Sequence, residues 1–172
     1  APPPTPVQLP TAPADMAPFF GSNTVHALIV DLLMREEFTA ICSPRLAAGV
    51  GNDLAQFIRS RPLLHVRQGE DLYQCWSIFA AQSGLEDMPV DRGIVLETAD
   101  LVIESAINDS GVGMLDPRLI PEELKSGRLV TPFKTAVKSG RSYFLVSRVE
   151  EIEIPRIAAF RAWVIEQFAK AN

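Results

Sequence analysis

Few residues in this sequence combine the types and the spacing that catalysis needs. His26 and His65 stand in separate apolar segments, and neither has a second His or Cys at metal-ligand spacing. The HExxH, CxxC and GxSxG patterns do not occur. Cys42 and Cys75 lie in segments that indicate a buried strand and a buried helix, which predicts free thiols. The sequence therefore predicts no catalytic residue, no metal site and no cofactor, and hence no enzyme.

The glycine-rich run Ser110-Gly111-Val112-Gly113 has the wrong order for a phosphate-binding loop. It follows a predicted helix and leads into a predicted strand. A phosphate loop needs strand, glycines and then helix, so that the N-terminus of the helix faces the anion. We interpret the run as a tight turn from helix to strand.

The junction over residues 96–101 has the polarity that ligand binding requires. A predicted strand ends at Leu96 and a helix follows, so Thr98 offers a hydroxyl beside backbone N–H groups that carry partial positive charge. Glu97 and Asp100 add negative charge, which favours a cationic or zwitterionic group nearby. Alternatively, Thr98 only caps the helix and the two acids complement its dipole. Both roles can coexist.

The elements that position this junction alternate between strands and helices. Apolar periodicity, caps and prolines predict strands at 38–42, 63–66, 93–96, 112–115, 129–130 and 142–147, with helices at 45–48, 54–61, 71–83, 98–110, 121–124 and from 155 onward. Such alternation predicts an α/β sandwich with a largely parallel sheet. The last helix carries an apolar stripe of Ile157, Phe160, Val164 and Phe168 beside Trp163.

Length and composition limit the classes of protein that are possible. The 172 residues, 47% apolar with a net charge of -5, are enough for one compact domain or two small lobes. The acidic balance and the lack of a basic stripe argue against nucleic-acid binding by this chain itself. No apolar stretch approaches the roughly 20 residues of a membrane span. Residues 1–18 hold seven of the fourteen prolines, which predicts an extended tail or linker.

Several short motifs, taken in their order, resemble the effector-binding domain of LysR-type transcriptional regulators. They run from Cys42-Ser43-Pro44-Arg45-Leu46 through Leu63-Leu64-His65, Trp76, Arg92-Gly93, Glu97-Thr98 and Gly111-Val112-Gly113-Met114 to Gly127-Arg128-Leu129-Val130-Thr131-Pro132-Phe133, Ser142-Tyr143-Phe144-Leu145-Val146 and Phe160-Arg161-Ala162-Trp163. Each motif is weak by itself, whereas their order and spacing across residues 38–168 are specific. The resemblance is greatest to the branch of the glycine-cleavage activator and the β-lactamase regulator.

The resemblance implies an α/β fold of two lobes, like a periplasmic binding protein, with a small inducer held between them. The second lobe would span residues 43–132, and residues 19–42 and 133–172 would form an incomplete first lobe. The family's pattern places a hydroxyl at Thr98 and a tyrosine at Tyr143 in the effector site. Tyr143 as a core strand residue is the alternative.

This sequence departs from the family's pattern at its start. The winged helix-turn-helix and the linker helix are not found in it, nor is the family's opening strand, helix and strand of the first lobe. Only residues 14–21 resemble a strand of that lobe, and Pro18 stands within them.

The resemblance predicts a cytoplasmic, non-enzymatic domain that senses a small polar metabolite and forms homo-oligomers. DNA would be bound only through a segment absent from this chain. Two alternatives share the fold: a solute-binding protein of the periplasm, and an orphaned interaction module that oligomerises through an exposed sheet edge.

Overall fold

The computed structural model describes residues 16–21, 28–48, 51, 53–68, 71–85 and 87–171. The chain divides into two compact units: unit 1 comprises Ala1–Glu36 and Gly140–Asn172, and unit 2 comprises Glu37–Ser139. Two long strands, β2 (Leu28–Ile41) and β7 (Val137–Arg148), each pass from one unit into the other. The sequence analysis expected a second lobe over residues 43–132, inside the bounds of unit 2. Most of the predicted tail, residues 1–15, lies outside the described residues.

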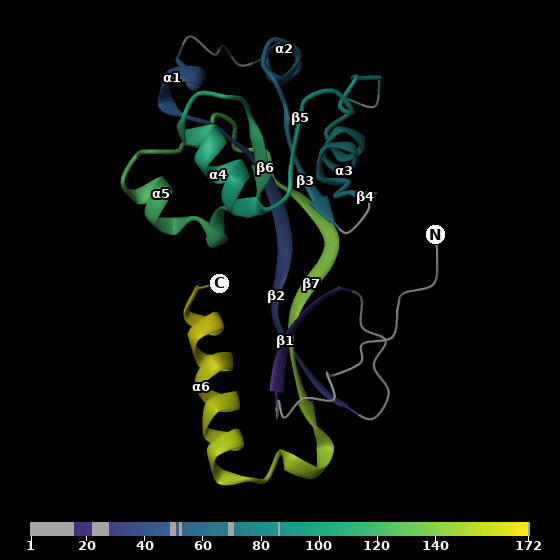
Figure 1. Cartoon of the computed structure of the whole chain (residues 1–172), viewed down its shortest axis with the longest axis vertical. Coiled ribbons are helices and arrows are strands. Elements are labelled where there is room, and N and C mark those ends of the chain that lie inside the picture. Colours follow the sequence, from purple (N-terminus) through teal and green to yellow (C-terminus); the bar gives the residue numbers. More distant parts are fainter. Residues whose placement is uncertain are drawn as a thin grey trace. The chain divides into compact units, whose positions relative to one another are not determined.

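Unit 1 combines strands with a long C-terminal helix (Figure 1). Strand β1 (Met16–Gly21) pairs antiparallel with β7, from Met16↔Ser147 to Gly21↔Ser142, and β7 also neighbours β2. After a short 3-10 helix, η2 (Val149–Glu151), helix α6 (Pro155–Ala171) begins at the predicted proline. Two hydrogen bonds from the Arg161 guanidinium to the Asp31 carboxylate join α6 to β2.

Unit 2 contains the remaining elements (Figure 1). They are α1 (Pro44–Ala47), α2 (Leu54–Arg59), β3 (Leu64–Gln68), β4 (Asp71–Leu72), α3 (Cys75–Gln82), β5 (Ile94–Leu96), α4 (Ala99–Ile107), β6 (Gly113–Leu115), η1 (Pro117–Leu119) and α5 (Pro121–Lys125). Strand β3 pairs parallel with β5 and antiparallel with β4, while β6 pairs antiparallel with the end of β2. The isolated bridge Leu63↔Val112 connects the two groups of strands.

Three predictions about these elements are wrong. The sheet is not largely parallel, since β1–β7, β2–β6 and β3–β4 are antiparallel pairs. The alternation of strands and helices along the chain does not determine the direction in which neighbouring strands run. Residues 71 and 72 pair with β3 instead of opening a helix, so α3 starts only at Cys75. In the predicted strand 129–130, Val130 forms an isolated bridge with Cys42.

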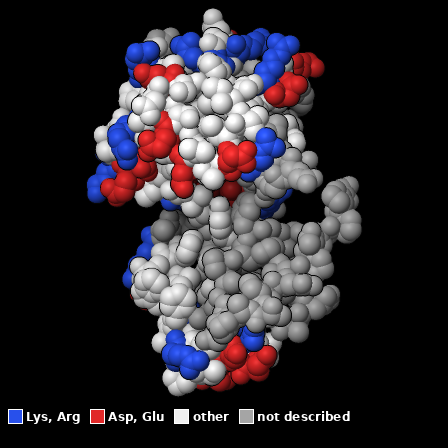
Figure 2. All heavy atoms as spheres, viewed as in Figure 1, with Lys and Arg blue, Asp and Glu red and all other residues white. Residues whose placement is uncertain are grey.

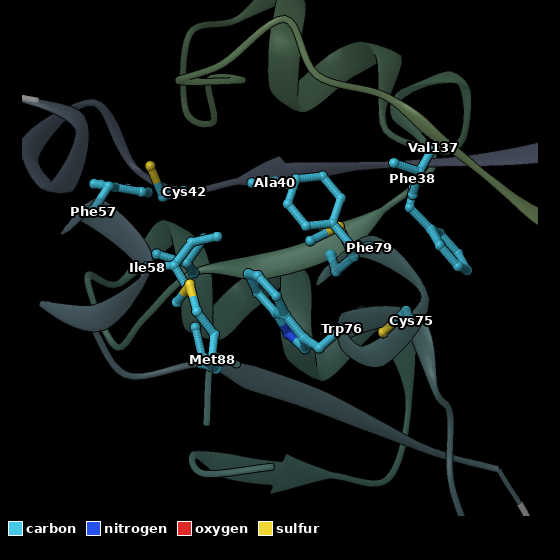
Figure 3. Close-up of a cluster of buried hydrophobic side chains, with 13 residues drawn as sticks. Phe38, Ala40, Cys42, Phe57, Ile58, Cys75, Trp76, Phe79, Met88 and Val137 are labelled. Carbon is cyan, nitrogen blue, oxygen red and sulfur yellow. The ribbon is translucent and has the colours of Figure 1, made fainter. Parts of the chain in front are cut away.

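Two hydrophobic cores lie on opposite faces of the strands in unit 2. Ala40 and Cys42 belong to one core, together with residues of α2 and α3, whereas Ile41 between them belongs to the other, with residues of α4 and α5. Successive side chains of a strand point to opposite faces, which explains this division. Figure 3 shows the first core, including Trp76 and Phe79 from α3. The helices thus cover both faces, as in an α/β sandwich.

Candidate functional site

Thr98 lies at the exposed N-terminus of α4, directly after β5. Its Oγ1 accepts a hydrogen bond from the backbone N–H of Leu101 at 3.3 Å, so the predicted cap is confirmed. The residue itself is exposed rather than sealed by neighbouring side chains. Its hydroxyl and the first turn of the helix are therefore accessible to a ligand.

The buried face of α4 holds this N-terminus in place. Val102 and Ala106 are fully buried in the second core. A Cβ on Gly113 would lie 2.8 Å from Cγ1 of Val102, so only glycine allows β6 to approach α4 this closely. Helix α4 ends at Ile107 and β6 begins at Gly113, so residues 110–113 lead from helix to strand as interpreted.

Glu97 lies beside Thr98 and is paired with an arginine that the sequence analysis did not single out. Nε of Arg67 donates to Oε1 of Glu97 at 3.0 Å, and both side chains are exposed. Parallel pairing of Val66 with Leu96 brings the two residues together, although thirty positions separate them. No spacing in the sequence signals such a contact. The junction thus presents a hydroxyl, a carboxylate and a guanidinium, which complement a zwitterionic group.

Tyr143 lies in unit 1. It is half-buried in β7, opposite Phe20 in the register with β1. The structure therefore brings Glu97 and Thr98 together within unit 2, and places the third predicted contact residue in the other unit.

The structure shows the surroundings of both cysteines and of one histidine. Cys42 and Cys75 are buried free thiols, as predicted. Burial raises the pKa of Cys42 to about 11 against the smaller opposing effect of Arg61, which makes this thiol a poor nucleophile at neutral pH. His65 is buried, with its Nε2 3.2 Å from the carbonyl oxygen of Arg92. His26 lies outside the described residues.

A comparison with protein families decides the family. The family model described as "LysR substrate binding domain" matches residues 8–169. The chain belongs to this family. The resemblance found in the sequence is confirmed, and so is an α/β fold like that of periplasmic binding proteins.

Similar proteins include bacterial regulators and a solved effector domain. The chain is 31% identical over 160 residues to the glycine cleavage system transcriptional activator of Escherichia coli K12, covering 90% of this chain and 50% of that protein. It is 31% identical over 169 residues to the transcriptional regulator DsdC of the same strain, covering 94% of this chain and 53% of that protein. The structure of the effector domain of AmpR from Pseudomonas aeruginosa matches with a TM-score of 0.79 and 26% identity, covering 95% of this chain and 76% of that domain.

The chain spans about half the length of the curated relatives that it matches. Within the part of the chain that the structure describes, we find no helix with the length and apolar character to cross a membrane.

Proposed function

We propose that this chain is the small-molecule-sensing domain of a LysR-type transcriptional regulator. The observation that carries this function is the family match over residues 8–169, because structurally similar chains are effector domains of transcriptional regulators. A ligand that binds two arrangements of the domain with different affinity shifts the balance between them, and this shift would carry the signal. The relatives are transcriptional regulators, so the solute-binding and orphaned-module alternatives are not retained.

The proposed ligand is a small polar metabolite, either amino-acid-like or peptide-like. Thr98 would donate or accept a hydrogen bond through its exposed hydroxyl, and Glu97 would attract a cationic group while Arg67 holds its carboxylate. Tyr143 would contribute a further hydroxyl from unit 1. The accessible cap and the adjacent ion pair support the first two assignments, and the resemblance supports the third.

The remaining parts of the proposal follow from the family. The domain would act in the cytoplasm without enzymatic activity and would form homo-oligomers. DNA binding would belong to another segment of a longer chain, because this chain carries a net charge of -5.

A thermal-shift screen tests the proposed function. Amino acids, muropeptide-like fragments and aromatic acids are added singly, and a ligand that binds the native state stabilises it by RT ln(1 + [L]/Kd). Thr98→Val and Tyr143→Phe should each weaken the best ligand by about tenfold, as expected for losing a hydrogen bond. Two variants that both retain wild-type affinity would show that the assigned site is wrong.

Matched variants separate ligand contact from helix capping. Thr98→Ser keeps both the cap and the hydroxyl, so it should retain the affinity. Thr98→Asp keeps the cap but changes the charge that the ligand meets. Tyr73→Phe is the control for Tyr143→Phe, because these are the two tyrosines of the chain. If no compound in the panel stabilises the wild type, the proposed ligand class is wrong.

A further inference from the structure

A cavity of about 250 Å³ opens in unit 2, away from Thr98 and Glu97. It lies between the end of α2 and the loop that precedes β5. Three arginines line it: Arg59, Arg61 and Arg92. No acidic residue is among the described residues of its lining. The described lining of the cavity therefore offers positive charge and no carboxylate.

The Arg61 side chain is the most enclosed of the three cations. It is half-buried, its Nε is buried without a hydrogen-bond partner in the described structure, and it lies 5.8 Å from the centroid of the Phe57 ring. One terminal nitrogen donates to the carbonyl oxygen of Ser60 at 3.3 Å. A buried donor without an acceptor is unfavourable, so a ligand oxygen that reached this group from the cavity would be stabilised.

The three arginines differ from other arginines of the chain in their partners. Six others form ion pairs: Arg45 with Asp109, Arg67 with Glu97, Arg118 with Asp116, Arg128 with Glu123, Arg148 with Glu151 and Arg161 with Asp31. Arg59, Arg61 and Arg92 form no ion pair with any residue that the structure describes. In Figure 2, basic side chains gather at the end of unit 2 where Figure 1 places α2.

The rest of the lining is apolar and firmly held. Ile58, Leu63 and Met88 contribute hydrocarbon, and the first two are almost fully buried. Gly93 has a φ of +150°, and a Cβ there would lie 2.0 Å from the carbonyl oxygen of Leu63. This close approach fixes the backbone beside Arg92 against the residue that precedes β3. The site is thus preformed, with an apolar wall next to its cations.

We propose that this cavity binds a small phosphomonoester, with the phosphate among the three guanidinium groups and the organic part against the apolar wall. A phosphate dianion presents three terminal oxygens to three guanidinium groups, whereas a carboxylate presents two and carries half the charge. One water occupies about 30 Å³ of liquid, so the cavity has room for more than a bare phosphate. This second ligand site is independent of the site proposed at Thr98.

Titration with inorganic phosphate, glycerol 3-phosphate and acetate at constant ionic strength tests the proposal. Calorimetry gives the affinities, and amide NMR spectra report where each anion binds. Both phosphates should bind saturably, glycerol 3-phosphate more tightly than phosphate and acetate at least about tenfold more weakly. The amides of Leu63 and Gly93 should shift, while those of Thr98 and Ala99 should not.

The double variant Arg59→Gln/Arg92→Gln provides the decisive comparison. Both side chains are exposed, so the fold should persist, and phosphate affinity should fall by at least about tenfold because two charge-assisted hydrogen bonds are lost. Arg128→Gln, an exposed arginine of the same unit outside the cavity, should leave the affinity within about twofold. Retained affinity in the double variant, absent saturable binding by the wild type, or shifts centred on Thr98 would each overturn the proposal.

Discussion

Helices α4 and α6 have similar amphipathic sequences but bury them to different extents. In α4, in unit 2, Val102 and Ala106 are fully buried in a core shared with strands and with α5. In α6, in unit 1, Ile157 is buried, whereas Phe160 and Trp163 are 49% and 55% exposed and stack on each other at 5.8 Å. Periodicity shows which side chains of a helix share a face, but the number of partners within the unit decides how much of that face is buried.

This contrast extends to the polar contacts of the two units. The Asp116 carboxylate in unit 2 is inaccessible and accepts hydrogen bonds from the backbone N–H groups of Glu37 and Arg118 and from the Arg118 guanidinium. The Asp31–Arg161 pair in unit 1 is partly exposed. We therefore expect substitutions in unit 2 to cost more stability than matched substitutions in unit 1.

The two tryptophans give the largest expected difference. Trp76 is buried in unit 2 and its indole N–H donates to the carbonyl oxygen of Leu64 at 2.9 Å, so Trp76→Ala should cost about 3–5 kcal/mol. Trp163→Ala, on the exposed face of α6, should cost less than about 1 kcal/mol. Urea unfolding followed by circular dichroism measures both. Equal losses would contradict the comparison of the two units.

The buried Asp116 and the partly exposed Asp31 should give a smaller difference in lost stability. Asp116→Ala leaves two backbone N–H groups and a guanidinium without their acceptor, so the free energy of unfolding should fall by about 3 kcal/mol. Asp31→Ala should cost about 1 kcal/mol, because water can solvate Arg161. The same unfolding experiment applies, with Asp116→Asn as the variant of conserved shape. A larger loss for Asp31→Ala would reverse the expected order.

Exposed ion pairs should show no difference between the units. Arg67–Glu97 in unit 2 and Glu166–Lys170 in unit 1 are both open to solvent, so salt and water screen them equally. Glu97→Gln and Glu166→Gln should therefore leave the unfolding midpoint almost unchanged. If Glu97→Gln alone is clearly destabilising, the pair with Arg67 has a structural role that its exposure does not suggest.

Local chemistry made parts of the fold predictable from the sequence. The cap at Thr98 forms as expected, and Ser43 and Asp53 cap α1 and α2 in the same way, because a short polar side chain before an apolar period satisfies the N–H groups at the start of a helix. The start of α3 was wrong, because the pairing of Asp71 and Leu72 with β3 depends on residues that lie in another strand. The antiparallel pairs formed by β2 and β7 likewise depend on contacts distant in sequence.

The candidate sites divide in the same way. Thr98 and Glu97 could be singled out because the change from strand to helix can be recognised locally. Arg67 was missed, since parallel pairing of β3 with β5 brings it to Glu97. The grouping of Arg59, Arg61 and Arg92 was missed as well. Arg59 ends α2 and Arg61 follows it, whereas Arg92 lies about thirty residues later in the loop before β5.

By itself, the sequence determined the family, the α/β class, the helix caps and the polarity of the junction at Thr98, because propensity, capping and motif order act over short spans of chain. The tertiary structure decided strand direction, the burial of each amphipathic face and which arginines form ion pairs. These properties depend on which distant segments come into contact, and the free energy of that packing is shared among residues that no local pattern connects.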